Sequence, residues 1–192
     1  MKYPQGWKKF CNWRKKNPDI SLPSHLNLSE LNRFAARFRL AQSYEGMILT
    51  DYPESTVNAY SSLFGVFLAY SALEQLYKAV GKPGDSIITE WGIIDKENAD
   101  KLRRSSQILT FLHDKVSNNQ LRKRIDEFRV GNDDNILVIA QALRHLIAHG
   151  IMTIYVKNVF AKTSINFCNL VKKIVLDKTQ NCFTEYIKNS IA

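Results

Sequence analysis

The sequence contains only three cysteines, Cys11, Cys168 and Cys182, and no two of them form a C-x-x-C pair. An odd number without such a pair argues against a disulfide framework and against a structural zinc site, and it favours a reducing compartment. The N-terminus is basic but lacks the apolar run of a signal peptide. These absences predict a cytoplasmic protein.

The glycine-containing motifs of several common enzymes are also missing. The sequence has no G-x-x-x-x-G-K-[ST], no G-x-G-x-x-G and no G-x-S-x-G, so it offers no basis for nucleotide hydrolysis, dinucleotide chemistry or α/β-hydrolase chemistry. No apolar run reaches the ~20 residues that a membrane span needs, and we expect no membrane partner. The longest run is interrupted by Asn58, Ser61, Ser62 and Ser71.

Hydrophobic residues make up 45% of the 192-residue chain. This is the composition of a globular protein, and the length suits one domain or one domain plus an arm. The formal net charge of +9 points to a polyanionic partner. Nucleic acid is the simplest candidate, although an acidic protein would satisfy the same charge.

The first 27 residues read as a basic arm ahead of a domain that we place at 28–192. Six Lys or Arg side chains precede the first acid, Asp19. Three interpretations fit this segment: a helix docked on the domain, an RNA-binding arm, and a membrane-surface anchor. Residues 18–28, with two prolines, would be a linker.

Aromatic residues recur at helical spacing within this arm, at Trp7, Phe10 and Trp13. They predict a short amphipathic helix over residues 6–16. Docking is favoured, because two exposed Trp side chains would be costly. The cationic face of a docked helix is still free to contact RNA phosphates. The arm lysines predicted to do so are Lys8, Lys9, Lys15 and Lys16.

The remainder predicts an all-α fold, a helical bundle of about five core helices. Periodic apolar residues and terminal Ser, Asn, Gly or Pro residues delimit the expected helices. The first is 29–49, capped by Ser29 or Asn27, and it is followed by helices over 54–80 and 95–116. The next runs from Asn118 or Asn119 to Val130, and then come 135–149 and a last helix that starts at Thr163 or Ser164. Residues 82–94 are expected to form a loop, with Trp91, Ile93 and Ile94 covering one end of the core. The β-branched run 151–156 could be extended but is too isolated to make a sheet.

The stretch 135–151 is the one around which the chain is organised. It contains no Lys, Asp or Glu. Asp133 and Asp134 precede it, where acidic side chains cap a helix, and Gly150 follows, where a left-handed C-terminal cap favours glycine. Helical spacing predicts one core-facing apolar stripe, formed by Ile136, Ile139, Ala140, Leu143 and Ile147.

The opposite face of this helix is small, apolar and punctuated by basic groups, unlike an ordinary solvated face. Its residues are Leu137, Val138, Gln141, Ala142, Arg144, His145, Ala148 and His149. A helix that is apolar nearly all round should be buried on both sides. We therefore expect the second face to meet a subunit, a ligand or both, and a homodimer is the simplest arrangement.

The segment Arg144-His-Leu-Ile-Ala-His149 resembles the R-x4-H signature of the HEPN superfamily. This resemblance implies a small helical domain, commonly dimeric, of a kind that includes many metal-independent ribonucleases of toxin–antitoxin, anti-phage and RNA-processing systems. It implies catalytic roles for Arg144, His149 and His145, no cofactor, and an antitoxin or other regulatory protein as a possible partner. Some toxin members carry a Tyr two residues after the His. Here that position is Ile151, which departs from that branch.

These three side chains suit RNA cleavage. A histidine fits both proton transfers, with an unperturbed pKa of about 6.5, and arginine binds phosphate. The substrate supplies its own 2′-hydroxyl nucleophile, so no metal is required. Arg144 and His149 lie about 140° apart around a helix. Arg144 must then fold round, the helix must unwind near Gly150, or two chains must share the site.

Other interpretations of the same residues remain. Arg144, His145 and His149 could be structural at a helical interface, in a non-catalytic RNA-binding or protein-interaction module. They could also form the basic pocket of a nucleotide or small-ligand sensor. His145 and His149 have the spacing for chelating zinc, but residue 146 is Leu instead of the Glu of a metalloprotease, so we predict no metal.

Glu74 lies on an otherwise apolar stripe of the helix 54–80. A carboxylate there needs a partner, because burying an unpaired charge is costly. We predict that Glu74 orients Arg144 or a histidine, that it forms an ordinary salt bridge with another arginine, or that it is simply exposed near the end of the helix.

Overall fold

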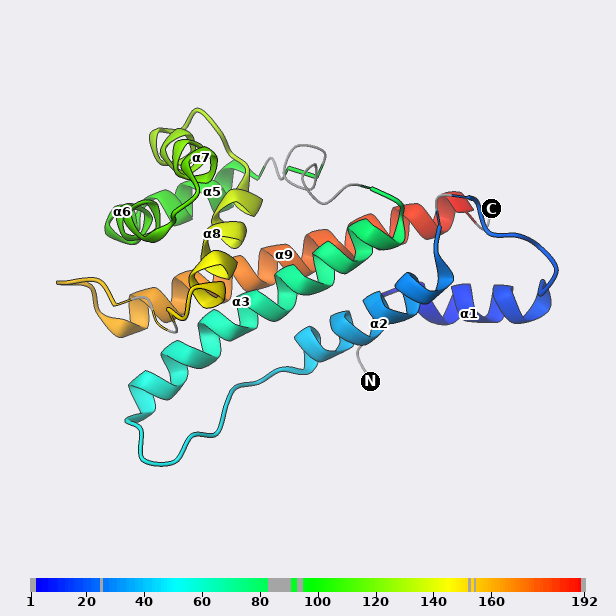
Figure 1. The fold of residues 1–192 in the computed structure, drawn as a ribbon, viewed down its shortest axis with the longest axis horizontal. Coiled ribbons are helices and arrows are strands. Elements are labelled where there is room, and N and C mark those ends of the chain that lie inside the picture. The colour runs from blue at the N-terminus through cyan, green and yellow to red at the C-terminus, as the bar shows by residue number, and fades with distance from the viewer. Residues whose placement is uncertain are drawn as a thin grey trace.

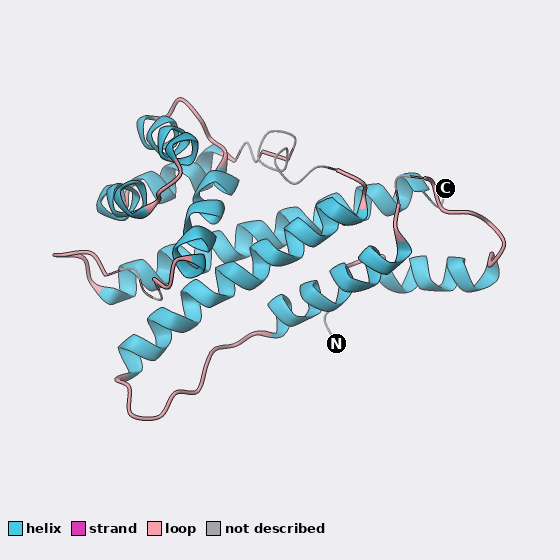
Figure 2. Ribbon diagram, viewed as in Figure 1, coloured by secondary structure: helices cyan, strands magenta, loops and turns pink. Residues whose placement is uncertain are grey.

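The computed structural model describes residues 3–24, 26–82, 91–92, 95–151, 153 and 155–190. This part of the chain contains eight helices and no strand (Figures 1 and 2). The helices are α1 (Trp7–Lys16), α2 (Leu28–Ser43), α3 (Glu54–Ala79), α5 (Lys96–Arg103), α6 (Ser106–Lys115), α7 (Asn119–Val130), α8 (Ile136–Ala148) and α9 (Ala161–Ser190). The predicted all-α class is confirmed, with more helices than the five expected. The expectation for Ile93 and Ile94 lies outside the described residues.

The long helices α3 and α9 lie side by side and run in the same direction, and α2 packs along α3 in the opposite direction (Figure 1). The shorter helix α8 packs against both α3 and α9, and also against α6 and α7. The core therefore lies around α3 and α8, whose inward side chains are inaccessible to solvent. Trp91 covers one end of this core, as expected, and its ring meets Tyr77 edge-on at 4.8 Å between centroids.

Helix α8 begins at a different cap from the one predicted. The side chain of Asn135, not of an aspartate, accepts a hydrogen bond from the Leu137 N–H at 3.0 Å. Asp133 instead accepts a bond from the Asn135 N–H at 2.8 Å, and Asp134 forms an ion pair with Arg103. The aspartates thus shape the approach to the helix, while a neutral amide caps it.

The C-terminal end of α8 is the one that the sequence predicts. Gly150 adopts a left-handed φ of 76°. Its N–H bonds to the Ile147 carbonyl at 3.0 Å, and the Ile151 N–H reaches the Leu146 carbonyl at 2.8 Å. This pair of bonds is the Schellman arrangement, which satisfies carbonyl groups that have no partner within the helix.

The second face of α8 is largely covered by the chain itself. Leu137, Val138 and Ala142 on that face are fully buried, because α3, α6, α7 and α9 surround the helix. Gln141, Arg144 and His145 on the same face are partly exposed, and Ala148 and His149 at its C-terminal end are exposed. The absence of Lys, Asp and Glu from this face is therefore explained within one chain and does not require a second subunit.

Three predicted boundaries are wrong. Helix α2 ends at Ser43 rather than Leu49. The chain then continues along α3 without helical structure, and the Met47 N–H donates to Ser61 Oγ at 2.9 Å. The helix expected over 95–116 is broken at residues 104–105 into α5 and α6, which lets α6 pack against α7 and α8. Helix α9 starts at Ala161, two residues before Thr163.

Other expected features are present. The side chain of Asn27 caps α2 and that of Asn118 caps α7. Gly131 ends α7 with a φ of 86°. The described residues of the run 151–156 form no strand.

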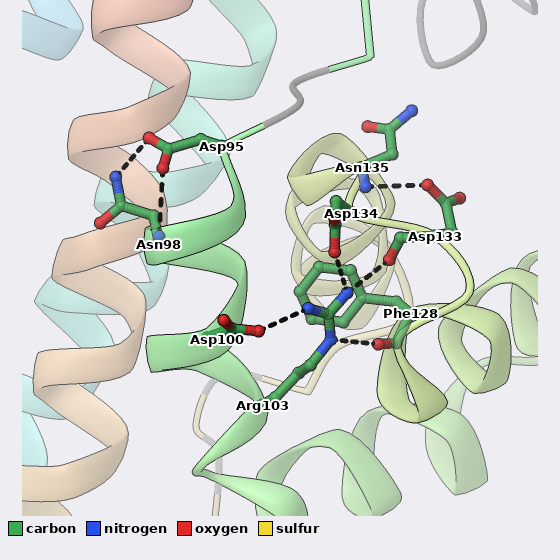
Figure 3. A network of polar contacts seen from close by, with 8 residues as sticks. All are labelled: Asp95, Asn98, Asp100, Arg103, Phe128, Asp133, Asp134 and Asn135. Atoms are coloured by element: carbon green, nitrogen blue, oxygen red, sulfur yellow. Dashed lines mark hydrogen bonds and ion pairs between the residues drawn. The ribbon is translucent and has the colours of Figure 1, made fainter.

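Arg103 at the end of α5 ties three segments together (Figure 3). Its Nε donates to the Phe128 carbonyl at 2.7 Å, and Nη2 donates to the Asp133 carbonyl at 2.8 Å. Its guanidinium also pairs with Asp134 and with Asp100, and it lies 4.8 Å from the centroid of the Phe128 ring. One cation thus joins α5 to the end of α7 and to the start of α8.

Helix α1 packs on the body of the fold through its aromatic face. Phe10 is buried, and the Trp7 ring lies 6.0 Å from that of Phe183 in α9. The Gln5 N–H donates to the Gln180 side chain at 2.7 Å. This packing is the one that the docking interpretation expects, while RNA contact by its lysines stays a prediction.

Candidate functional site

Arg144 projects from α8 toward α3, where its Nη2 lies 3.5 Å from Glu74 Oε1. Both side chains are partly exposed, at 40% and 37%. The carboxylate that interrupts the apolar stripe of α3 therefore has a partner, and that partner is Arg144, one of those predicted. Whether Glu74 orients Arg144 for a reaction stays a prediction.

Three helices meet at Glu74. Burial raises the pKa of its carboxyl, while Arg144 from α8 and Arg37 from α2 act to lower that pKa. Arg37 itself donates to Ser71 Oγ at 3.2 Å. One turn earlier on α3, burial and the charge of Glu74 raise the pKa of Tyr70. A single carboxylate thus lies between two arginines at the edge of the core.

The two histidines of α8 lie against each other, with ring centroids 4.1 Å apart and ring planes 50° apart. His145 Nε2 is 3.1 Å from Ser117 Oγ, and the Ser117 N–H also points at this nitrogen at 3.4 Å. Because the backbone N–H is a donor, Nε2 acts as an acceptor and the imidazole is neutral in this arrangement. His149 is exposed at the end of the helix.

The environment of His145 lowers its pKa below the ordinary 6.5. Burial is the first cause, followed by the neighbouring charges of His149 and Arg144. At neutral pH, His145 is therefore a free base able to accept a proton.

The lowered pKa of His145 predicts a pH-dependent stability. The unfolded chain binds a proton near pH 6.5 more readily than the folded chain does, so the free energy of unfolding should fall as the pH drops below about 6.5. Urea unfolding of the wild type and of His145→Gln between about pH 5 and pH 7.5 measures the free energy of unfolding at each pH. In the variant, this free energy should depend less steeply on pH. Equal slopes in the two proteins would contradict the prediction.

The structure brings the predicted catalytic residues together only in part. His145 and His149 form one pair, in which His145 contacts Ser117, whereas Arg144 pairs with Glu74 on the neighbouring side of α8. This separation follows the helix geometry that the sequence indicated. Arg144 still acts on the histidines through its charge, as the pKa of His145 shows.

The arm lysines lie elsewhere. Lys8, Lys9, Lys15 and Lys16 are all exposed on α1, which lies at the far end of the bundle from the C-terminal end of α8 (Figure 1).

A cavity of about 500 Å³ lies between the starts of α3 and α9 and includes Tyr44 and Lys172. None of the predicted site residues lines it.

Sequence reasoning missed two polar neighbours of the site. Ser117 precedes α7 and carries no local pattern that would connect it to His145, 28 residues later. Arg37 acts on Glu74 only because α2 packs along α3. Both contacts depend on how helices pack, so no local signal in the sequence identifies them.

No family model, curated protein or solved structure matches this chain. The family resemblance therefore depends on the six residues from Arg144 to His149 and on the helical class.

Within the described part of the chain, no group of three His, Cys, Asp or Glu side chains is placed to hold a metal ion. No described helix combines the length and apolar character required for a transmembrane span.

Proposed function

We propose that this protein is a metal-independent endoribonuclease of the HEPN type, acting in anti-phage defence or in a toxin–antitoxin pair. The observation that carries the proposal is the contact between His145 and His149, with ring centroids 4.1 Å apart. One of these rings has a lowered pKa, and the arginine of the motif lies next to it. Two adjacent imidazoles and a guanidinium supply a base, an acid and an anion-binding group.

Each group has a role in the proposed reaction. His145, as the neutral base, takes the proton of the 2′-hydroxyl on Nε2, the nitrogen that would exchange its contact with Ser117 for the substrate. The 2′-oxygen then attacks the adjacent phosphorus. The bond from phosphorus to the 5′-oxygen breaks, and His149 gives that oxygen a proton. The products are a 2′,3′-cyclic phosphate and a 5′-hydroxyl. Arg144 binds the phosphate oxygens as negative charge develops on them.

Glu74 does not prevent this role of Arg144. A guanidinium has five N–H donors in a planar fork, and the contact with Glu74 involves only the Nη2 side at 3.5 Å. The remaining donors of this partly exposed side chain are available to a phosphate. Glu74 would thus be a positioning residue, holding one edge of the guanidinium while the other edge binds substrate.

The proposal predicts cleavage that is insensitive to EDTA and leaves 2′,3′-cyclic phosphate ends. The reason is that the 2′-hydroxyl is the nucleophile and the protein supplies both proton transfers. Incubation of the purified protein with labelled RNA, with and without EDTA, followed by end-group analysis, tests it. Products with 5′-phosphate and 3′-hydroxyl ends, or activity abolished by EDTA, would overturn the mechanism.

The second candidate is a non-catalytic helical module that binds RNA or a partner protein. The ion pair of Arg144 with Glu74 and the hydrogen bond of His145 to Ser117 favour it, because both are contacts that a purely structural role would require. This module would bind RNA and leave it intact in the same assay. A homodimer and a regulatory partner such as an antitoxin remain predictions under either candidate.

A further inference from the structure

The solvent side of α1 carries a shallow groove of about 480 Å³. Its lining contains three lysines, two asparagines and one tryptophan, and no acid. These residues are Lys8, Lys9, Asn12, Trp13, Lys16 and Asn17. A surface with three ammonium groups and no carboxylate has a positive potential that attracts polyanions.

The groove lies on a fixed platform. Besides the contacts of Trp7 and Gln5 with α9, the Tyr3 hydroxyl accepts a bond from Arg39 at 2.7 Å. At the other end of α1, the side chain and the N–H of Asn17 both donate to the Trp13 carbonyl, at 2.8 and 3.0 Å. A ligand in the groove would therefore meet a preorganised surface, with little ordering entropy to lose.

Trp13 has the position of a stacking platform. Its indole lies beside the Phe10 ring, with centroids 6.5 Å apart and planes 21° apart, and this contact restricts the orientation of the ring. The same side chain is partly exposed and lines the groove. An oriented aromatic ring among lysines is the combination by which proteins bind single strands, with bases on the ring and phosphates on the cations.

The cations of α1 divide into those that line the groove and those that do not. The groove is lined by Lys8, Lys9 and Lys16, but not by Lys15 or Arg14. Arg14 is engaged with the backbone, because its guanidinium donates to the carbonyls of Asn17 and Ile20. The structure thus distinguishes three lysines from their neighbours on the same short helix.

We infer that this groove binds single-stranded nucleic acid, with a base stacked on Trp13 and phosphates on Lys8, Lys9 and Lys16. The inference rests on the proposed function in taking nucleic acid as the partner, but it does not depend on cleavage. It goes beyond a general electrostatic footprint because it requires an unpaired base, and because it excludes Lys15 from the site.

A deoxythymidine strand of about ten nucleotides tests the groove without cleavage, since it has no 2′-hydroxyl. Binding should quench tryptophan fluorescence in the wild type, and Trp13→Phe should lose most of that quenching. Trp13→Ala should weaken binding by about 5- to 100-fold. Replacing Lys8, Lys9 and Lys16 with Gln should reduce the slope of log affinity against log salt by about two.

The matched control replaces Lys15, Lys173 and Lys188, which are exposed lysines outside the groove, with the same loss of charge. It should leave most of the affinity intact, and Lys15→Gln alone should cost less than Lys16→Gln. Circular dichroism checks the fold of every variant, and Trp13→Phe keeps the inference testable if Trp13→Ala unfolds.

Three results would overturn the inference. The first is an equal loss of affinity in the two triple-lysine variants, and the second is binding of the matching duplex as tightly as the single strand. The third is binding of a poly-glutamate peptide in place of the strand. The last would identify an acidic protein as the occupant. If the protein binds the strand but does not cleave RNA, the ribonuclease proposal is rejected and the binding site on α1 stands. If it cleaves RNA but does not bind the deoxythymidine strand, the binding site is rejected and the ribonuclease proposal stands.

Discussion

His149→Ala is expected to lower the rate of RNA cleavage by about 10²- to 10⁴-fold, the usual effect of removing a general acid or base. His149 is exposed at the end of α8 and contributes little to the core, so the loss should come with little loss of stability. His145→Ala should have an effect of similar size, because it removes the other proton-transfer group. Initial rates on a labelled RNA oligonucleotide measure both.

His113→Ala is the matched control. His113 lies on α6 and contacts Asp114 and Asp126, at 3.0 and 3.3 Å, away from the motif, so its loss should leave the rate unchanged. A wild-type rate for His149→Ala would reject the assignment of the site. Mixing inactive Arg144→Ala with inactive His149→Ala then tests whether two chains share a site, since only a shared site can recover part of the activity.

Arg103→Ala is expected to lower the free energy of unfolding by about 3 kcal/mol, the effect of breaking a largely buried ion pair and leaving its partners unsatisfied. The side chain of Arg103 is only 15% exposed. Its removal leaves Asp134 and the carbonyls of Phe128 and Asp133 without their donor. Chemical denaturation of the purified proteins measures the difference.

The neighbouring Arg104→Ala is the control for this prediction. Arg104 is exposed at the junction between α5 and α6, and surface substitutions of this kind change stability by about 0.5 kcal/mol or less. If Arg103→Ala and Arg104→Ala have equal effects, the network in Figure 3 does not hold α8 in place. Arg103→Lys should restore only part of the stability, because an ammonium cannot reproduce the planar fork.

Local patterns were sufficient for features that depend on neighbours in the sequence. Gly131 and Gly150 ended their helices at left-handed φ values, because a residue without Cβ adopts this conformation without strain. The helix predicted over 54–80 was correct to within one residue, since one long run with few charges has a single interpretation as a buried helix. The burial of the α8 stripe, apart from the half-buried Ile147, follows from its 3.6-residue period.

Features that join distant segments came only from the packing of the helices. The sequence left Arg144, a histidine, another arginine or solvent as the neighbour of Glu74, and the crossing of α3 with α8 selected Arg144. Ser117 reached His145 because the turn between α6 and α7 lies beside α8. Asp134 paired with Arg103 and left the cap of α8 to Asn135. Such contacts are set by which surfaces bury the most apolar area together, and a one-dimensional pattern does not encode that choice.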